Sequence, residues 1–138
     1  MEWTWDDLTI TDEAERIDVD ALCGWLAGSY WAAERSRATI LRSIAGSVCL
    51  SAFAGGKQVG FLRAITDGAT FSWICDVIVD EAHRGRGVGK RLVAAAVEHP
   101  TLKDTHMGLG TRDAHGLYEQ YGFVRREAMV RRIGGTAG

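Results

Sequence analysis

The sequence predicts an α/β fold in which a mixed central sheet of about six to seven strands carries helices on both faces. Residues 48–79 show the period-two alternation of strands, interrupted by the turn pairs Gly55-Gly56 and Asp67-Gly68. After residue 80 helical and extended patterns alternate, which is typical of crossover connections between parallel strands. The chain of 138 residues has one proline, no repeat and no linker, so we expect one domain over residues 1–138.

The individual elements follow in order from local patterns. Alternation beginning at Leu8 predicts a short opening strand. Apolar residues at helical spacing predict a helix over residues 18–29, which Asp18 can cap, and a second helix over residues 33–45. Three strands follow, over residues 48–53, 59–65 and 71–79, and the first two form a hairpin.

The second half predicts four further elements. An alanine- and valine-rich helix spans residues 88–99 and ends before Pro100. A short buried strand is expected over residues 107–111, and a helix over residues 114–121 that Gly122 stops. Residues 123–133 are expected to form a final extended segment, and how the sheet ends is left open.

Composition excludes several classes of protein. With 46% hydrophobic and 25% charged residues the chain is neither disordered nor membrane-spanning, and its acidic start is unlike a secretory signal. The net charge of −2 gives no argument for nucleic-acid binding. Three widely spaced cysteines indicate reduced thiols in a cytoplasmic protein. Residues 70–138 carry 10 basic and 8 acidic groups, against 6 and 10 in residues 1–69, so the second half is the better place for an anionic ligand.

A glycine-rich turn between a strand and a helix is the most informative segment. It reads Arg84-Gly85-Arg86-Gly87-Val88-Gly89-Lys90. Bare peptide N–H groups at a helix N-terminus attract an anion such as a diphosphate, and the three basic side chains add to this. The spacing fits neither a P-loop, which needs one more residue and then Ser or Thr, nor the dinucleotide fingerprint G-x-G-x-x-G. A plain basic turn remains the alternative.

This turn resembles the Arg/Gln-x-x-Gly-x-Gly/Ala signature of the GNAT superfamily of N-acetyltransferases. Residues 114–123, AHGLYEQYGF, are similar to a second block of that family, A-x-x-L-Y-x-x-x-G-F. The resemblance implies the GNAT fold, with the sheet splayed at an acyl-CoA cleft beside the strand that precedes the turn. It also implies acetyl-CoA as co-substrate, with no metal.

The resemblance assigns roles to particular residues. Peptide groups of Val77, Ile78 and Val79 would bind the pantetheine arm. The diphosphate would lie against the turn, formed by Arg84, Gly85, Arg86, Gly87, Val88, Gly89 and Lys90. Tyr118 would protonate the leaving thiolate, and its alternative interpretation is a core aromatic residue.

The general base is left open. Asp76 is the first candidate, because an aspartate inside an otherwise apolar strand is costly to bury. Simple alternation places Asp76 on the face of Ile74 and Ile78, and a bulge, usual in the family, would change that. The alternative for Asp76 is a structural carboxylate bonded to the backbone or to an arginine. His115 is a second candidate for the base.

An acceptor pocket is expected between the first two helices and the hairpin region. Tyr30 and Trp31, together with Phe71, Trp73 and Asp67, would form an aromatic, mildly acidic wall suited to a small cationic or aromatic primary amine. The same aromatics could instead fill the core. We therefore expect an N-acetyltransferase acting by direct attack in a ternary complex. The alternatives are a non-catalytic acyl-CoA-binding or sensor domain, and a protein acetyltransferase acting on lysines or N-termini. Exposed strand edges make a homodimer one option, and no membrane or nucleic-acid partner is expected.

Overall fold

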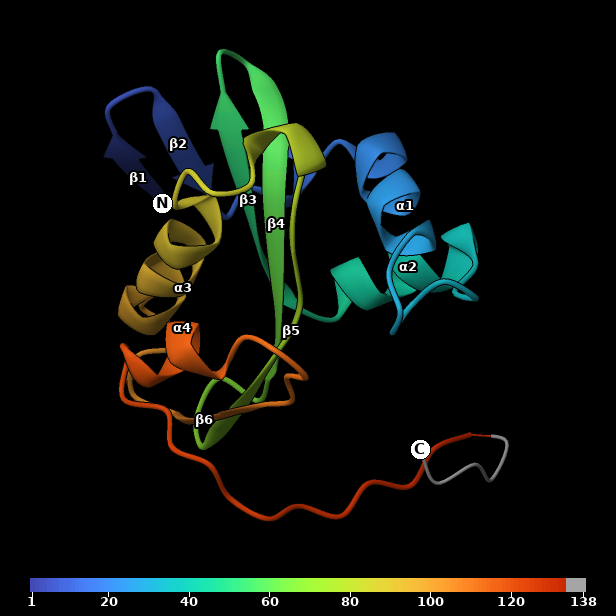
Figure 1. The fold of residues 1–138 in the computed structure, drawn as a ribbon, viewed down its shortest axis with the longest axis vertical. Coiled ribbons are helices and arrows are strands. Elements are labelled where there is room, and N and C mark those ends of the chain that lie inside the picture. The colour runs from blue at the N-terminus through green and yellow to red at the C-terminus, as the bar shows by residue number, and fades with distance from the viewer. Residues whose placement is uncertain (134–138) are drawn as a thin grey trace.

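A six-stranded sheet with the order β1-β2-β3-β4-β5-β6 forms the centre of the computed structural model, which describes residues 1–133 (Figure 1). Each neighbouring pair is antiparallel except β5 and β6, which run parallel. The mixed sheet is therefore as predicted. Its strands are β1 (Glu2–Trp5), β2 (Leu8–Thr11), β3 (Val48–Ala54), β4 (Lys57–Thr66), β5 (Phe71–Val79) and β6 (His106–Leu109).

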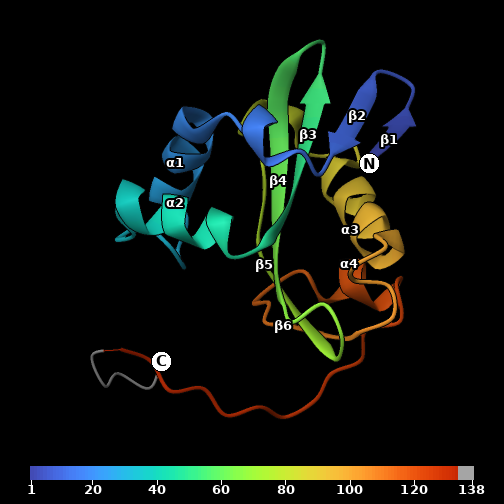
Figure 2. The same cartoon turned by 180° about the vertical axis from the view of Figure 1, so that it is seen from behind.

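Four α-helices cover the two faces of this sheet. Figures 1 and 2 show α1 (Val19–Ala27) and α2 (Arg37–Ala45) on one face, and α3 (Val88–Glu98) and α4 (His115–Glu119) on the other. The carboxylate of Asp18 accepts from the Ala21 amide at 3.1 Å and caps α1, and the Ser36 hydroxyl caps α2. None of the helices within residues 1–133 is long and apolar enough to cross a bilayer.

Each face of the sheet has its own apolar core. Phe61 of β4 and Ile78 of β5 point towards α1 and α2, where they pack with Leu22 and Leu26. The opposite core, under α3, is built mainly from buried aliphatic side chains: Leu50, Val59, Leu62, Ile74, Val88, Leu92, Val93 and Leu102.

A glycine lets α3 approach the sheet closely. A Cβ atom on Gly60 of β4 would lie 2.8 Å from Cγ1 of Val88 and 3.1 Å from Cδ1 of Leu92. These distances are shorter than a van der Waals contact, so the position requires glycine. The first turn of α3 is thereby fixed against the middle of the sheet.

The predicted order of elements is correct except at the two ends. The chain opens with a hairpin of β1 and β2, where one strand was expected, and Asp6 makes its turn with φ 51°. The final extended segment expected over residues 123–133 forms no strand within residues 1–133. The charged run Arg125-Arg126-Glu127 interrupts the alternation, and no strand of the described chain pairs with this segment.

Candidate functional site

Strands β5 and β6 separate halfway along β5. Only Phe71, Ser72, Trp73 and Ile74 pair with β6, whereas β5 continues to Val79. On the other side Cys75, Ile78 and Val79 keep their pairing with β4. Within residues 1–133 no strand therefore pairs with Val77, Ile78 and Val79 on the β6 side, and the one side-chain contact to their backbone comes from Arg84 Nε, which donates to the Val79 carbonyl. This is the splayed sheet that the resemblance implied.

A bulge in β5 lies at Asp76. Between Phe61 and Arg63 of β4 there is one residue, but between their partners Ile78 and Cys75 of β5 there are two. Asp76 itself has φ 51°, a left-handed conformation that aspartate tolerates better than most residues. Because of the bulge, Ile74 faces α3 whereas Ile78 faces α1 and α2. The simple alternation expected from the sequence fails here, and the bulge accounts for it.

The carboxylate of Asp76 is enclosed by three donors. Arg63 Nε lies 2.9 Å and Arg35 Nη1 2.8 Å from Oδ2, and Trp31 Nε1 lies 2.9 Å from Oδ1. Burial raises the pKa of Asp76, but the hydrogen bonds from Arg63 and Trp31 and the two guanidinium charges outweigh it and hold the pKa below its usual range. A carboxylate held in this way is a poor proton acceptor. The arrangement favours a structural role for Asp76, in which it ties the α1–α2 loop to β5, over the role of general base.

The glycine-rich turn presents unpartnered backbone donors. Within residues 1–133 the backbone N–H groups from Gly85 to Lys90 donate no hydrogen bond, and α3 begins after Gly87 without a side-chain cap. Gly85 and Gly87 both have φ 80°, and a Cβ on either would meet nothing within 4 Å. A ligand can therefore reach the backbone at this point.

The cations of the turn are free as well. Among the described residues Arg84, Arg86 and Lys90 make no ion pair, and all three are exposed. The helix dipole, the amides and these charges all favour an anion in one place. A short η2 turn (Glu81–His83), braced by a 2.9 Å hydrogen bond between His83 and Asp80, leads the chain into this segment.

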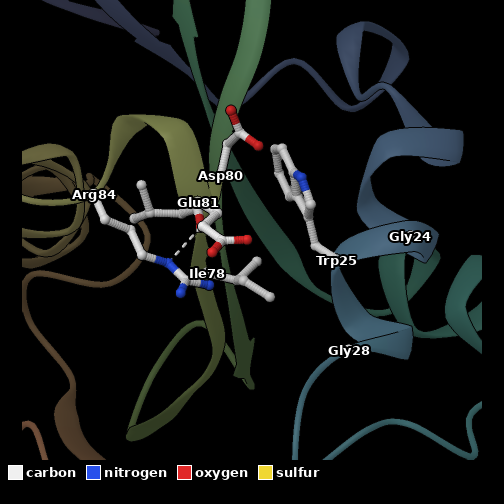
Figure 3. Close-up of a pocket in the computed structure, with 8 residues that line it drawn as sticks. Gly24, Trp25, Gly28, Ile78, Asp80, Glu81 and Arg84 are labelled. Carbon is white, nitrogen blue, oxygen red and sulfur yellow. Dashed lines mark hydrogen bonds between the residues drawn. The ribbon is translucent and has the colours of Figure 1, made fainter.

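A pocket of about 350 Å³ opens between α1 and the end of β5 (Figure 3). Ile78, Val79 and Arg84 line it, and all three were predicted to hold the cofactor. Arg84 is held by a 3.3 Å hydrogen bond from its Nε to the Val79 carbonyl. The indole of Trp25 faces Asp80 across the pocket in Figure 3. The remaining lining residues are Gly24, Gly28 and Glu81.

Tyr118 is a buried residue of α4 with an accessible hydroxyl. Its ring packs on Phe123 with centroids 5.9 Å apart. Nothing within residues 1–133 hydrogen-bonds to the Tyr118 hydroxyl. If that oxygen were buried it would be a buried polar atom without a partner, and Ser51 Oγ is the one such side-chain atom in the described chain. Solvent therefore reaches the Tyr118 hydroxyl. Burial raises the pKa of Tyr118, and the nearby Tyr30 adds to the increase, so the phenol is protonated at neutral pH.

Tyr30 and Trp31 lie together in the loop between α1 and α2, as predicted. Their rings meet edge to face with centroids 5.0 Å apart. Arg112, which follows β6, places its guanidinium carbon 3.7 Å from the centroid of Tyr30. Arg112 makes no ion pair within residues 1–133. The loop therefore carries a positive charge at its aromatic surface, where a mildly acidic wall was expected.

The other residues assigned to this wall have different surroundings. The carboxylate of Asp67 accepts hydrogen bonds from the Ala69, Thr70 and Phe71 amides and from the Thr70 hydroxyl. These bonds hold the β4–β5 turn and lower the pKa of Asp67, and no described contact joins Asp67 to Tyr30 or Trp31. Trp73 and Phe71 cover Gly108 of β6, where a Cβ would lie 2.8 Å from the Phe71 ring.

Four residues of the site were missed from the sequence: Trp25, Arg35, Arg63 and Arg112. A signal existed for one of them. Arg63 stands in a strand that is otherwise apolar, and Asp76 stands in the same situation in the next strand. Two buried opposite charges on consecutive antiparallel strands indicate an ion pair. The positions of Trp25, Arg35 and Arg112 depend on loop packing that no local pattern shows.

Comparisons with known proteins identify the relatives of this chain. Residues 45–125 match the family model described as the acetyltransferase (GNAT) domain. A crystal structure from Xanthomonas campestris pv. campestris, assigned to the GNAT family, shares 35% identity over 96% of this chain and 97% of that one, with a TM-score of 0.89. Glucosamine-6-phosphate N-acetyltransferase from Arabidopsis thaliana shares the fold (TM-score 0.67, 16% identity, 92% and 98% coverage). A relative in Gibberella zeae assigned as an acetyltransferase is 25% identical over 64% of this chain, and the match spans 61% of that protein's length.

Proposed function

Because this chain belongs to the GNAT family of acetyltransferases, we propose that it transfers an acetyl group from acetyl-CoA to a small primary amine within a ternary complex. The observation that carries the proposal is the continuity of two free backbone surfaces. The unpaired edge of β5 leads directly into the turn whose amides have no acceptor within residues 1–133. A pantetheine arm and a diphosphate need these two surfaces in this order.

The residues present fit the co-substrate. The amides from Gly85 to Lys90 would hold the diphosphate, with Arg84, Arg86 and Lys90 balancing its charge. Peptide groups of Val77, Ile78 and Val79 would pair with the amides of the pantetheine arm. Acetyl-CoA would supply the acetyl group as a thioester.

We assign the acid step to Tyr118. When the amine forms its bond to the acyl carbon, the bond to sulfur breaks and the thiolate needs a proton. The Tyr118 hydroxyl is accessible and, because burial raises its pKa, protonated. The pKa of an ordinary phenol lies above that of an ordinary thiol, and burial raises the pKa of Tyr118 further, so the proton transfer is uphill and is driven by the breaking of the bond to sulfur.

The amine must also lose a proton. An alkylammonium with a pKa of about 10 costs about 4 kcal/mol to deprotonate at pH 7. The arginines around Asp76 make it a poor acceptor, so we assign this proton to His115, which lies one turn before Tyr118 in α4, or to water in the cleft. A His115→Gln variant that keeps the acidic limb of the rate–pH profile would leave water as the acceptor.

The acceptor is proposed to be aromatic, and to carry an anion. Tyr30 and Trp31 give the α1–α2 loop an exposed aromatic surface, and Arg112 stacks on Tyr30 as a cation with no ion pair within residues 1–133. Cationic amines, which the sequence also allowed, would meet this charge unfavourably. We therefore expect phenylalanine to be acetylated faster than phenethylamine, and phenethylamine faster than spermidine. In an Arg112→Gln variant the first two amines should converge.

A Tyr118→Phe variant tests the whole proposal. Loss of one general acid lowers kcat by about 10²- to 10⁴-fold, and the hydroxyl is not part of the diphosphate surface, so CoA affinity should stay unchanged. Thiol release reports turnover, and the CoA-induced rise in Tm reports binding. A wild-type protein that binds CoA and acetylates no amine would instead be the non-catalytic acyl-CoA-binding domain.

The three free thiols fit the reducing cytoplasm.

A further inference from the structure

The loop between α1 and α2, residues 28–36, carries the aromatic surface of the site without helix or strand structure of its own. Its Ala32 side chain is buried in the core on that face of the sheet. Within residues 1–133 two hydrogen bonds join the loop to the sheet. Trp31 Nε1 donates to Oδ1 of Asp76 at 2.9 Å, and Arg35 Nη1 donates to Oδ2 at 2.8 Å. The polar attachment of the loop therefore depends on a single carboxylate.

This carboxylate carries one more cation than its charge requires. Arg63 of β4 donates from Nε to Asp76 at 2.9 Å and from Nη1 to the Ser47 hydroxyl at 3.0 Å, and its side chain is 10% exposed. That pair alone neutralises the carboxylate within the sheet. Arg35 places a second guanidinium on the same oxygen, so one carboxylate and two guanidinium groups leave a net charge of +1. Two like charges on one oxygen repel each other. The charge balance of the sheet does not need Arg35, but the attachment of the loop does.

From Asp76 a series of contacts runs through the loop to the other side of the cleft. Trp31 meets Tyr30 edge to face at 5.0 Å, and Arg112 stacks on Tyr30 at 3.7 Å. Arg112 lies between β6 and α4, and α4 covers the face of the sheet opposite α1 and α2 (Figures 1 and 2). Tyr30 also lies close enough to Tyr118 to raise the pKa of that phenol. A shift of the loop would therefore move the aromatic surface relative to the proposed acid.

We infer that Arg35 is a positioning residue for the acceptor: through Asp76 it holds the α1–α2 loop, with Tyr30 and Trp31, in the position that binds the amine. This role rests on the proposed function, because it needs that aromatic surface to contact the acceptor. A loop released from Asp76 is in the binding position for only part of the time, and the apparent affinity for the acceptor falls by that fraction. Once bound, the amine meets the same acid and the same thioester, so kcat changes little.

Steady-state kinetics with phenylalanine as the varied acceptor and saturating acetyl-CoA test this role. Arg35→Met keeps the length of the side chain and removes its charge and donors. It should raise KM for phenylalanine about 10-fold, the least that loss of a hydrogen bond to a charged group changes an equilibrium, with kcat within about 2-fold and the CoA-induced rise in Tm unchanged. Arg35→Lys keeps a cation for the single contact to Asp76, so KM should stay within about 3-fold of wild type. Arg37→Met is the matched control: Arg37 pairs with Asp20 at 2.7 Å on the surface, and KM should not change.

Amide hydrogen exchange gives a readout that needs no turnover. The amides of Ser29, Ala32 and Arg35 are hydrogen-bonded within the loop, and in Arg35→Met they should exchange about 10-fold faster than in wild type or Arg37→Met, with β4 and β5 unchanged.

Three results would overturn the positioning role. They are faster exchange with an unchanged KM, a raised KM with unchanged exchange, and equal losses of kcat and CoA binding. A wild type that acetylates no amine would refute the proposed function and with it the acceptor role, while the exchange rates would still show whether Arg35 holds the loop.

Discussion

Replacing Asp76 by asparagine separates the two roles considered for this residue. Asparagine keeps the shape of the side chain and tolerates the left-handed backbone, where φ is 51°. It removes the charge that Arg63 and Arg35 face at 2.9 and 2.8 Å. The Arg63 side chain is only 10% exposed, so its guanidinium would be left buried without a counter-ion.

The expected loss of stability is large. Removing one partner of a buried ion pair costs about 3–5 kcal/mol, against a total stability of about 5–15 kcal/mol for a domain. The carboxamide oxygen can still accept from Trp31, so Asp76→Asn should lie at the lower end of this range and Asp76→Ala at the upper end. Urea unfolding followed by tryptophan fluorescence and by circular dichroism measures the difference.

A matched control lies on the surface. Asp20 and Arg37 form an ion pair at 2.7 Å with both side chains more than half exposed, and Asp20→Asn should leave the unfolding midpoint unchanged. If Asp76→Asn were as stable as wild type and lost turnover with a changed pH profile, the structural role would be refuted and Asp76 would be the base.

The pH dependence of the unfolding free energy is a second test of the same ion pair. The pKa of Asp76 lies below its usual value of about 4. A lowered pKa in the folded state means that the stabilisation is fully present above the unfolded pKa and is lost as pH falls through the folded one. The gap in unfolding free energy between wild type and Asp76→Asn should therefore be constant near neutrality and shrink below pH of about 4. A gap that grows on acidification would contradict the assigned direction.

Three further changes test other parts of the molecule. Gly87→Ala and Gly55→Ala both place a side chain at positive φ (80° and 58°) with no clash. Each should lower the free energy of unfolding in urea by about 1–2 kcal/mol. Only Gly87→Ala should reduce the CoA-induced rise in Tm. Gly60→Ala should cost about 1–3 kcal/mol, because its Cβ would lie 2.8 Å from a valine methyl of α3. Burial raises the pKa of Cys49 to about 12 and that of Cys75 to about 11. At pH 8 both thiols should react with a thiol reagent at least about 100-fold more slowly in folded than in urea-unfolded protein, and equal rates in the two states would contradict the raised pKa values.

The sequence predicted those parts of the molecule that short-range chemistry decides. Asp18 caps α1 and the glycines of residues 84–90 open the turn because each acts on its immediate neighbours. The contacts of Asp76 are not local, since Arg63 is 13 and Arg35 is 41 residues away: opposite charges in consecutive apolar strands indicate the first contact, and no pattern indicates the second. The expected strand over residues 123–133 is missing from the described chain for a related reason. A strand pattern predicts an extended backbone and does not say which edge provides its partner.

One local irregularity links the two halves of the site. At Asp76 the bulge inserts a residue into β5, and from the same point onward β5 no longer pairs with β6 within the described chain. The free backbone proposed for the pantetheine arm and the carboxylate that holds Trp31 and Arg35 therefore arise from one distortion of the strand. A regular β5 would keep Ile74 and Ile78 on one face, whereas the bulge lets Ile74 face α3 while Ile78 and the Asp76 carboxylate face the α1–α2 side. The bulge thus places the proposed cofactor edge next to the aromatic residues that we propose contact the acceptor, and a residue that cannot adopt φ near 50° at position 76 should disturb both.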